Sequence, residues 1–312
     1  YYKRKQHLAA FSLINPYIVQ SRSDKKLLQR LQQDDYPVLM EGIHCTYLLK
    51  KGLLKGHKTF VRLHNVEYKY YRQLAKHETN ILKKIYYLHE SILLKKYEHA
   101  IANKAVFWPV SIDDTELYKR KFHAQQIDFL PVFLPWKEIS TKPGKGCFCL
   151  YHGNLEVNEN EKAADWLLNN VFDTLEIPFV IAGRNPSLPL QTLAHAHMHT
   201  CMTVNPTDAD MQDMISKAQV NILPSFNKTG VKLKLMNAMF NGRHCLVNEA
   251  GIEGTGLEGL CHVAGSAADF KKKIAGLFQQ EFTEAQLLQR KESLEHLYNN
   301  EKNARQLIAW IY

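Results

Sequence analysis

The stretch that decides the fold is residues 220–249, which read VNILPSFNKTGVKLKLMNAMFNGRHCLVNE. It holds two apolar runs of strand length, 220–223 and 244–247. Between them, apolar residues recur at helical spacing from 233 to 239, and Asn241-Gly242 provides a helix stop. A buried strand, an amphipathic helix and a second buried strand form one βαβ unit, and such units build a parallel sheet.

The same alternation extends along the rest of the chain. Upstream, helical patterns occupy 163–171 and 209–218, and strand-like runs occur at 147–151, 178–182 and 201–204. In the first half, strand-like runs occur at 38–40, 59–63 and 105–108. A long helix before the last of these is indicated by apolar residues at three- to five-residue steps, namely Ile81, Ile85, Leu88, Ile92 and Tyr97. We therefore predict an α/β protein with two Rossmann-like domains.

Charge is distributed unevenly between the two halves. Residues 1–145 carry 26 Lys and Arg against 13 Asp and Glu, whereas residues 146–312 carry 14 against 18. Lys142-Pro143-Gly144-Lys145-Gly146 has the composition of a linker and falls where this balance changes. We predict an N-terminal domain over 1–141, a ligand-binding domain over 142–296, and a C-terminal helix over 297–312 that is a candidate for crossing back to the first domain. The basic half could face anionic lipid or phosphorylated small molecules, or it could be a solvated lysine-rich surface.

Several classes of protein are disfavoured. No run of 18 apolar residues predicts a membrane-spanning helix, and residues 1–7 lack the apolar stretch of a secretory signal. They also lack an initiator Met, so we expect a fragment or a processed form. The six cysteines form no C-x-x-C pair, which favours a reduced, cytoplasmic chain with no metal site. No Walker-type loop occurs, and no basic run is interleaved with aromatic residues, so ATPase activity and nucleic-acid binding lack support.

Small and polar residues follow the predicted strands of the second half. In an open parallel sheet, ligands bind outside the carboxyl ends of the strands, and small residues there let a ligand approach the backbone. This rule nominates a set of strand-end residues, namely Gly153, Asn154, Gly183, Arg184, Asn205, Ser225, Asn248 and Glu249. The alternative for any single one is an ordinary turn between a strand and a helix.

The segment from Thr229 to Asn237 is the most informative one for chemistry. Gly230 is expected to open a helix whose free N–H groups and positive dipole end would attract an anion. Lys232 and Lys234 lie in the first turn, where lysine opposes the helix dipole unless an anion is expected. We predict a phosphate site here, the alternative being two solvated lysines.

In the first half, polar residues follow the predicted strand 59–63. Arg62, His64, Asn65 and Glu67 stand where this strand hands over to a helix. We consider Arg62 and His64 candidates for contact with a ligand across a cleft between the domains. The alternative is that Asn65 caps the helix and His64 is a surface residue.

Taken together, these residues resemble the retaining glycosyltransferases of the GT-B fold, most closely family four, which uses nucleotide-sugar donors. Residues 223–256 look like its donor-site signature, in which a strand ends in Pro-Ser, a G-x-x-x-K helix follows and a further strand comes next. Arg62-x-His64-Asn65-x-Glu67 resembles an R-x-H-N-x-E element of some members, and Tyr151-His152-Gly153-Asn154 the glycine turn that opens their second domain. The resemblance implies two Rossmann-like domains whose parallel sheets face each other across a cleft, and an incomplete first domain.

The resemblance also implies roles for single residues. Lys234, Lys232 or Arg184, together with the turns at Gly230 and Gly153, would stabilise the diphosphate leaving group. Asn237 would hold the ribose, Glu249 or Asn248 the sugar hydroxyls, and His64 the transferred sugar or the acceptor. Asn154, Gly183, Ser225 and Thr229 complete the donor side, and Arg62, Asn65 and Glu67 the acceptor side. No metal and no cofactor is expected.

The expected activity is transfer of a sugar, with retention, from a nucleotide-diphosphate sugar to a glycan or lipid-linked acceptor. The protein would be cytoplasmic, with its basic half a candidate for peripheral contact with the anionic inner face of the membrane.

One departure from the family pattern favours alternatives to this activity. The family usually carries a Glu-x7-Glu pair, and this chain has Thr229 and Asn237 at those positions. A neutral amide gives up the charge-assisted hydrogen bond of a carboxylate. A non-catalytic GT-B module that binds a sugar nucleotide or a protein partner, or a sugar-nucleotide epimerase, would fit that loss.

Overall fold

The computed structural model describes residues 2, 4, 5 and 12–312. Residues 1, 3 and 6–11, in the opening segment for which the sequence predicts no secretory signal, lie outside the described residues. The chain forms two compact units. Unit 1 comprises Tyr1–Val132, Thr229–Val231 and Glu301–Tyr312, and unit 2 comprises Phe133–Lys228 and Lys232–Asn300.

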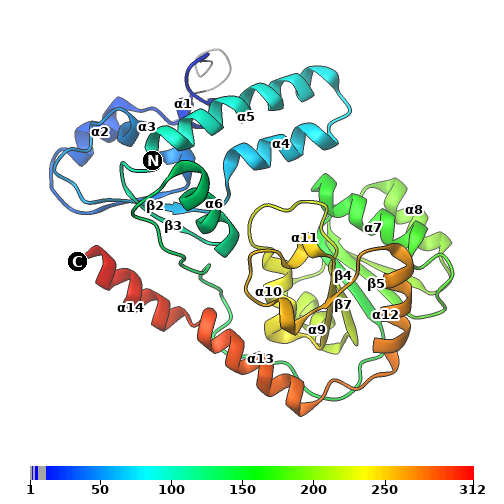
Figure 1. The fold of residues 1–312 in the computed structure, drawn as a ribbon. Coiled ribbons are helices and arrows are strands. Elements are labelled where there is room, and N and C mark those ends of the chain that lie inside the picture. The colour runs from blue at the N-terminus through cyan, green and yellow to red at the C-terminus, as the bar shows by residue number, and fades with distance from the viewer. Residues whose placement is uncertain (1, 3, 6–11) are drawn as a thin grey trace. The chain divides into compact units, whose positions relative to one another are not determined.

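Unit 1 is built on a three-stranded parallel sheet in the order β1-β2-β3 (Figure 1). Its elements are α1 (Tyr17–Gln20), α2 (Lys25–Leu31), β1 (Val38–Glu41), η2 (Ile43–Cys45), α3 (Tyr47–Lys50), β2 (Thr59–Leu63), α4 (Glu67–His77), α5 (Ile81–Ile101), β3 (Val106–Pro109), α6 (Ile112–Phe122) and α14 (Asn300–Ile311), the last of which begins in unit 2. The three predicted strands are thereby confirmed, and β2 has the predicted bounds. Within the described ranges, no helix is both long and apolar enough to cross a membrane.

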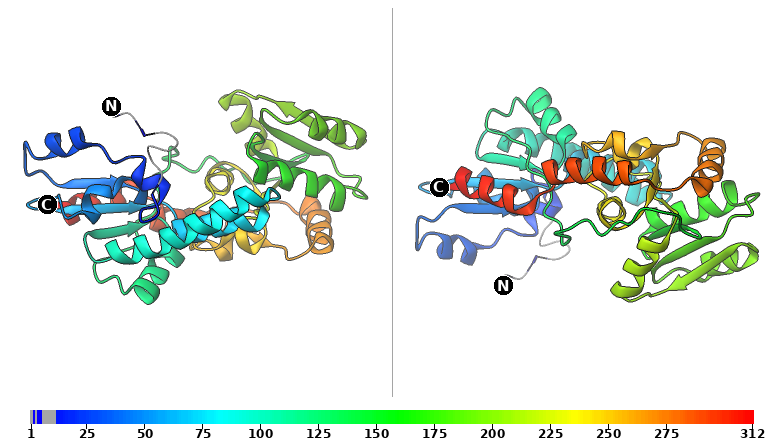
Figure 2. Two further views of the ribbon diagram at one scale, coloured as in Figure 1. Left: turned by 90° about the horizontal axis from the view of Figure 1, so that it is seen from above. Right: turned by 90° about the horizontal axis from the view of Figure 1, so that it is seen from below.

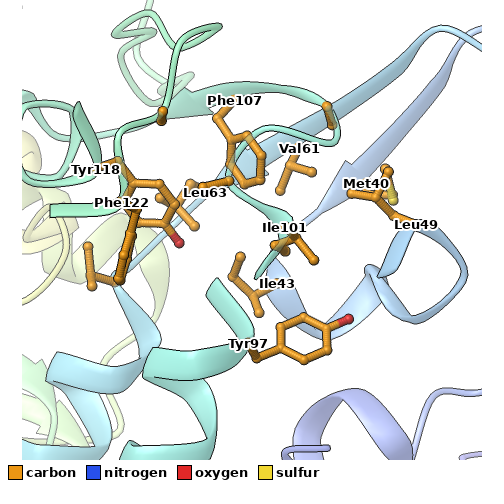
Figure 3. Packing of buried hydrophobic residues seen from close by; sticks show 14 of the residues in the cluster. Met40, Ile43, Leu49, Val61, Leu63, Tyr97, Ile101, Phe107, Tyr118 and Phe122 are labelled. Atoms are coloured by element: carbon orange, nitrogen blue, oxygen red, sulfur yellow. The ribbon is translucent and has the colours of Figure 1, made fainter. Parts of the chain in front are cut away.

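The two faces of the unit 1 sheet are covered differently because side chains alternate along each strand. Val61, Leu63 and Phe107 point to the main core, which α5 and α6 close with residues such as Tyr97 and Tyr118 (Figure 3). The opposite face holds the smaller cluster of Phe60, Trp108 and Leu130, against which Leu307, Trp310 and Ile311 pack.

The C-terminal helix α14 is therefore part of unit 1, and it lies along the sheet (Figure 2). The indole ring of Trp310 stacks on that of Trp108, with 5.6 Å between ring centroids and 21° between planes. Phe60 stacks on Trp108 as well, at 4.6 Å. Phe60 and Trp108 are both buried in this stack, so α14 forms part of the layer that covers this face of the sheet.

One buried carboxylate fixes the start of α4. The side chain of Glu98 on α5 is fully buried. It accepts hydrogen bonds from the backbone N–H of Glu67 at 3.0 Å and of Tyr68 at 3.2 Å, and from the hydroxyl of Tyr118 at 2.9 Å. These bonds satisfy N–H groups that the first turn of a helix leaves without intrahelical partners. Burial nevertheless raises the pKa of Glu98 to about 8 and that of Glu67 to about 7.

Unit 2 is a doubly wound parallel sheet in the order β6-β5-β4-β7-β8-β9 (Figure 1). Its elements are β4 (Cys149–Asn154), α7 (Asn158–Asn170), β5 (Phe179–Arg184), α8 (Leu188–Ala196), β6 (Thr200–Val204), α9 (Asp208–Lys217), β7 (Val220–Ile222), α10 (Leu233–Asn241), β8 (His244–Val247), α11 (Glu249–Ile252), η3 (Glu258–Leu260), β9 (His262–Val263), α12 (Ala267–Gln279) and α13 (Glu284–Leu297). Helices α7, α8 and α12 pack on one face of the sheet, and α9 packs on the other. The predicted parallel α/β fold is confirmed.

Two local expectations need correction. The helix expected to open at Gly230 begins instead at Leu233, because Gly230 takes a left-handed conformation, with a φ of 68°, that does not continue into a helix.

The stretch 142–146 has the composition of a linker but is docked on unit 2. Gly144 and Phe282 exchange backbone hydrogen bonds, and the Thr141 hydroxyl donates to the carbonyls of Phe240 and Gly242.

The raised pKa values of Glu67 and Glu98 make the stability of unit 1 depend on pH. In the folded state these carboxyls hold protons that the unfolded chain has released, so stability is full below the ordinary carboxyl pKa and is lost as pH rises through about 7 to 8. We expect the urea midpoint to fall between about pH 5 and pH 8, read from Trp108 and Trp310 after Trp136→Phe and Trp166→Phe. Glu98→Gln should flatten that slope, and Glu116→Gln, at an exposed position, should leave it unchanged. A slope of the opposite sign would contradict the assignment.

Candidate functional site

The sheet of unit 2 reverses its winding between β4 and β7. Strands β4, β5 and β6 progress in one direction from this point, and β7, β8 and β9 progress in the other. Helices therefore leave β4 and β7 toward opposite faces, and a crevice forms outside the carboxyl ends of these two strands. Gly153 and Asn154 end β4, and Ser225 follows β7, so this is the position that the topology assigns to a ligand.

Lys234, in the first turn of α10, extends its ammonium group into this region. Its Nζ lies 3.3 Å from the Tyr151 hydroxyl and 3.2 Å from Oδ1 of Asn160, and 4.7 Å from the centroid of the Tyr151 ring. Burial lowers the pKa of Lys234 to about 8, with a further contribution from Lys232. Among the residues that the structure describes, no carboxylate lies within ion-pairing distance of this group. The site thus holds a half-buried cation whose contacts are to neutral groups, with the Glu159 carboxylate acting on it only from beyond ion-pairing distance. Such a cation favours the binding of an anion.

Asn160, in the first turn of α7, connects this cation to the end of β4. Its Nδ2 donates to the backbone carbonyl of Asn154 at 3.0 Å, and its backbone carbonyl accepts from the Tyr151 hydroxyl at 2.8 Å. Tyr151 and Asn160 were not predicted as site residues from the sequence. For Asn160, the available signal was a polar residue in the first turn of the helix that follows Gly153-Asn154. In a βα unit the first helical turn lies beside the carboxyl end of the preceding strand.

His152 is a second residue that sequence reasoning did not select for the site. Its side chain is buried, and burial together with Lys234 lowers its pKa to about 3, so the ring is neutral. Within the described part of the chain, its Nε2 has no hydrogen-bond partner. A buried polar nitrogen without a partner is uncommon in folded proteins and is often found where a ligand or water completes the site.

The two predicted strand-end glycines have different reasons to be glycine. A Cβ on Gly183 would collide with the Gly153 carbonyl oxygen and come within 2.7 Å of the Leu155 side chain. A Cβ on Gly153 would meet nothing closer than the Asn160 side chain at 3.4 Å, an ordinary contact. Gly183 is thus required by packing of the protein itself, whereas nothing inside the protein requires glycine at position 153.

Ser225 and Asn248 tie the ends of β7 and β8 together. The backbone N–H of Ser225 donates to Oδ1 of Asn248 at 2.9 Å, and Nδ2 of Asn248 donates to the Ser225 carbonyl at 2.8 Å. The Ser225 hydroxyl donates to the Asn227 carbonyl at 2.9 Å. The Asn248 amide is therefore occupied in shaping the loop after β7, while neighbouring Glu249 is exposed at the start of α11.

Arg184 and Asn205 lie farther out along the sheet, on β5 and after β6. Arg184 is exposed, and its guanidinium is 3.5 Å from the exposed carboxylate of Asp208. Asn205 has a positive φ of 52°, and its Oδ1 accepts the backbone N–H of Asn185 at 2.8 Å. The switch point joins β4 and β7, and β5 is one strand removed from it, so Arg184 is not part of the cluster around Lys234.

The remaining predicted donor-side residues lie on or before α10. Lys232 is half-buried at the N-cap, and the helix begins without a side-chain cap. Oδ1 of Asn237 accepts a hydrogen bond of 2.7 Å from Asn241, whose own Oδ1 accepts from Ser140. Asn237 therefore retains only its amide nitrogen for a ligand. Thr229 and Gly230 cluster with unit 1, where a Cβ on Gly230 would collide with the Asn65 side chain.

In unit 1, Arg62 is buried and is bonded to backbone. Its guanidinium donates to the carbonyls of Trp108 at 3.0 Å, Leu130 at 2.5 Å and Pro131 at 2.6 Å. Burial lowers its pKa to about 10, so it stays charged near neutral pH. With these three carbonyls bound, Arg62 holds the segment after β3 against the sheet.

His64 and Glu41 form a pair at the carboxyl ends of β2 and β1. Nε2 of His64 lies 2.7 Å from Oε2 of Glu41, and both side chains are exposed. A carboxylate at one ring nitrogen fixes the orientation of the imidazole. Glu41 was not selected from the sequence. In the sequence, Glu41 is marked only as a polar residue at the end of an otherwise apolar strand.

Glu67 begins α4 and is partly buried.

Two further patterns can be set aside within the described chain. Across the described residues, no group of three or more His, Cys, Asp or Glu side chains is arranged to hold a metal ion. The sequence Gly254-x-Gly256-x-x-Gly259 has the spelling of a dinucleotide-binding loop. It lies between α11 and η3, however, and not between a strand and the helix that such a loop requires.

Three comparisons place this geometry among known proteins. Residues 147–280 match the family model described as Glycosyl transferases group 1. A Klebsiella pneumoniae protein, described as an uncharacterized 44.6 kDa protein in the cps region, is 30% identical over 251 residues. That match covers 77% of this chain and 64% of that protein.

Solved structures are similar at the level of fold. The GtfA/B complex gives a TM-score of 0.65 at 14% identity, covering 91% of this chain and 60% of that one. A Staphylococcus aureus TarM variant in complex with fondaparinux, alpha-GlcNAc-glycerol and UDP gives 0.62 at 11% identity, covering 91% and 58%. This chain spans less than two thirds of the length of each of these three proteins. It has the GT-B fold of glycosyltransferases, and over residues 147–280 of unit 2 it matches the family of group 1 glycosyl transferases.

Proposed function

We propose that the protein is a retaining, metal-independent glycosyltransferase that takes a nucleotide-diphosphate sugar at the switch point of unit 2. The observation that carries this proposal is Lys234, a half-buried cation with no carboxylate at ion-pairing distance among the described residues, beside the glycine turn of β4. A diphosphate is the anion that suits this position, since backbone N–H groups at a strand end and a helix N-terminus add donors to the cation. The family match over residues 147–280 supports the same ligand.

The demanding step is departure of the nucleoside diphosphate. Negative charge grows on its phosphate oxygens as the glycosidic bond breaks, and the new bond to the acceptor oxygen forms on the same face of the sugar. Lys234 would stabilise that charge, supported by Lys232 and by the turn at Gly153. Because Asn160 and Tyr151 hold the ammonium group in place beforehand, little reorganisation would be needed during the reaction.

The remaining donor-side residues would bind the rest of the nucleotide sugar. The side-chain amide of Asn237 would donate an N–H hydrogen bond to a ribose hydroxyl. The carboxylate of Glu249 would accept hydrogen bonds from hydroxyls of the sugar. Asn248, whose amide is occupied by Ser225, would act by holding the loop after β7. We assign the acceptor side to unit 1, with His64 oriented by Glu41 as the residue that contacts sugar or acceptor.

The acceptor is proposed to be a glycan or a lipid-linked saccharide. The Klebsiella relative is described as encoded in a cps region, which supports a role in polysaccharide synthesis. The six cysteines are all free thiols, which agrees with a reducing, cytoplasmic location.

The proposal is tested by nucleotide binding followed by turnover. UDP is the first nucleotide to titrate in a thermal-shift assay, because the TarM structure contains it, with GDP, ADP and CMP alongside. Saturating ligand at about a hundred times its Kd adds about 2.7 kcal/mol of stability, a shift of several degrees. Binding followed by release of nucleoside diphosphate from the sugar donor supports a transferase. Binding with sugar conversion and no release indicates an epimerase, and binding with neither indicates a non-catalytic module. No shift with any of the four contradicts the donor site.

Replacing Lys234 should separate stability from function. Lys234→Met removes a charge whose burial is unfavourable, so the chain should become more stable to urea at pH 7 by about 2 kcal/mol. The same variant should bind nucleoside diphosphate at least about tenfold more weakly, because a charge-assisted contact is lost. Lys217→Met, which removes an exposed lysine paired with Asp213, is the matched control and should alter neither property appreciably. If Lys234→Met lowers stability and leaves binding intact, the lysine is structural.

The affinity for nucleoside diphosphate should fall as pH rises through about 8. Lys234 is charged below its pKa of about 8 and neutral above it, whereas the diphosphate is fully ionised throughout this range. We expect binding to be about thirtyfold weaker at pH 9.5 than at pH 7, measured by calorimetry. The pH dependence should disappear in Lys234→Met. A wild-type affinity that is constant over this range would exclude Lys234 as the binding cation.

The two strand-end glycines offer a matched pair of substitutions. Gly183→Ala should destabilise unit 2 by about 1–3 kcal/mol, because the added methyl group collides with the Gly153 carbonyl. Gly153→Ala should change the free energy of unfolding by less than about 0.5 kcal/mol and yet weaken diphosphate binding, since its methyl group occupies space that the ligand needs. Urea unfolding and nucleotide titration of both variants decide the matter. Full binding by Gly153→Ala would show that the ligand does not approach this turn.

A further inference from the structure

Three cationic side chains of unit 1 are held close together by the segment around Ser21. The backbone N–H of Lys5 donates to the carbonyl of Ser21 at 2.8 Å, and Nζ of Lys5 donates to the Ser23 hydroxyl at 2.8 Å. Nε of Arg4 donates to the Ser21 hydroxyl at 3.2 Å. These bonds hold residues 4 and 5 alongside 21–23, so Arg4 and Lys5 lie beside Arg22. We call Arg4, Lys5 and Arg22 the basic cluster.

The basic cluster lies at the ligand-binding end of the unit 1 sheet. Arg22 directly follows α1 and Ser21, and α1 packs against η2, the turn that comes after β1. Burial, with smaller contributions from the charges of Arg22 and Arg4, lowers the pKa of His44 in η2 to about 4. His64, which follows β2, acts on the same imidazole. The cluster is therefore close to the carboxyl ends of β1 and β2, outside which an open parallel sheet binds its ligands.

Acidic side chains offset only part of the charge of this cluster. Across the described residues, no carboxylate lies within ion-pairing distance of Arg4, Lys5 or Arg22. Residues 1, 3 and 6–11, which lie outside the described ones, include no Asp or Glu. Glu67 acts on Arg22 only from beyond that distance, and burial raises the pKa of Glu67 to about 7, so it is only partly ionised near neutral pH. Positive charge is thus left over to attract an anion.

Arg22 has the donor groups that an oxyanion requires. Its side chain is half-buried, and burial, followed by the charge of Arg4, lowers its pKa. One terminal N–H donates to the Ile18 carbonyl at 2.7 Å, and within the described residues its guanidinium donates to no other protein group. Arg62 and Arg290, by contrast, each donate to three backbone carbonyls. The unused edge of the Arg22 guanidinium matches the paired oxygens of a carboxylate or a phosphate.

Tyrosine rings border the basic cluster on the side of α4 and α5. Tyr71 on α4 is close enough to Arg22 to affect the pKa of that guanidinium. From Tyr71, ring contacts continue to Tyr87 and Tyr86 on α5, with 6.0 Å and 5.6 Å between successive ring centroids. The Tyr86 side chain is 40% exposed. A tyrosine ring offers an apolar face and a polar hydroxyl, and a pyranose has a face of C–H groups bordered by hydroxyls, so the two surfaces are complementary.

We propose that the basic cluster binds an acidic group on the acceptor saccharide, the carboxylate of a uronic acid or a phosphate ester, with Arg22 selecting for that group and Tyr86 packing against the sugar ring. This assignment depends on the proposed function only in placing the acceptor on unit 1, and no donor-side residue takes part in it. Inorganic phosphate alone suits the position less well, because it has no apolar face for the exposed ring.

Binding of small saccharides to the full chain, without any donor, tests this proposal. The probes are methyl β-glucuronide, glucose 6-phosphate and the neutral methyl β-glucoside, titrated by calorimetry. We expect at least one acidic sugar to bind at least about tenfold more tightly than the glucoside, because a charge-assisted hydrogen bond is added. Preference for the glucuronide identifies a carboxylate, and preference for glucose 6-phosphate identifies a phosphate. Failure to prefer either acidic sugar would overturn the proposal, as would inorganic phosphate binding as tightly as both.

Replacement of Arg22 should remove the preference for acid. Arg22→Gln should weaken binding of the preferred acidic sugar at least about tenfold and leave binding of the glucoside unchanged. Arg22→Lys keeps the charge but loses the planar fork, so it should bind only about threefold more weakly than the unaltered chain and guards against misfolding of the first variant. The matched control, Arg30→Gln, removes the same charge from an exposed position on α2 and should have little effect. Equal losses in Arg22→Gln and Arg30→Gln would reduce the preference to general surface charge and overturn the proposal.

The aromatic part is tested with Tyr86→Leu. This change should weaken binding of acidic and neutral sugars alike by about fivefold, whereas Tyr36→Leu, at a more exposed tyrosine of unit 1, should not. Unchanged binding in Tyr86→Leu would exclude this ring from the site. Nucleotide titration should be the same in every one of these variants. A chain that binds nucleotide without preferring acidic sugars would contradict only the acceptor assignment, and one that prefers acidic sugars without binding nucleotide would contradict only the donor site.

Discussion

The proposed donor side of this molecule depends on one constraint, the partial withdrawal of the Lys234 ammonium group from water beside the ends of β4 and β7. The parallel sheet creates the crevice, and α10 brings the lysine into it. Tyr151 and Asn160 then supply an aromatic face and an amide oxygen, which are weaker partners than a carboxylate. The cation therefore remains able to bind an anion strongly, which a salt bridge with the protein would have prevented.

The buried polar groups of unit 1 have the opposite character, because protein groups satisfy them. Arg62 has three backbone carbonyls, and Glu98 has two backbone N–H groups and a tyrosine hydroxyl. These bonds shape the segments around the carboxyl end of β2, where His64 and Glu41 meet. The difference between a buried polar group that the protein satisfies fully and one that it satisfies only in part separates residues that hold the fold from those available to a ligand.

Local patterns in the sequence were sufficient for the fold. The apolar runs at 59–63 and 244–247 predicted β2 and β8 with their observed bounds, because fully buried parallel strands are short continuous apolar runs. The start of α10 was misplaced because a left-handed glycine looks the same in sequence as a helix-opening one. For the site, the two lysines near the start of α10 drew attention to the region where the Lys234 ammonium group contacts Tyr151 and Asn160, and a phosphate site there stays a prediction. Tyr151, Asn160 and Glu41 were not predicted, because each contacts a partner from another element and the local pattern at Asn160 and Glu41 does not show which partner that is. The roles assigned to single residues remain predictions.

The position of α14 has a consequence for how the protein is made. Trp310 stacks on Trp108 and closes one face of the first sheet, yet it is separated from that sheet by the whole of unit 2 in the sequence. During synthesis, unit 2 emerges and can fold while the Phe60–Trp108 face of unit 1 is still uncovered. Of the two units, unit 1 begins to emerge before unit 2 but is completed after it, so its aromatic face stays exposed to other chains during that interval.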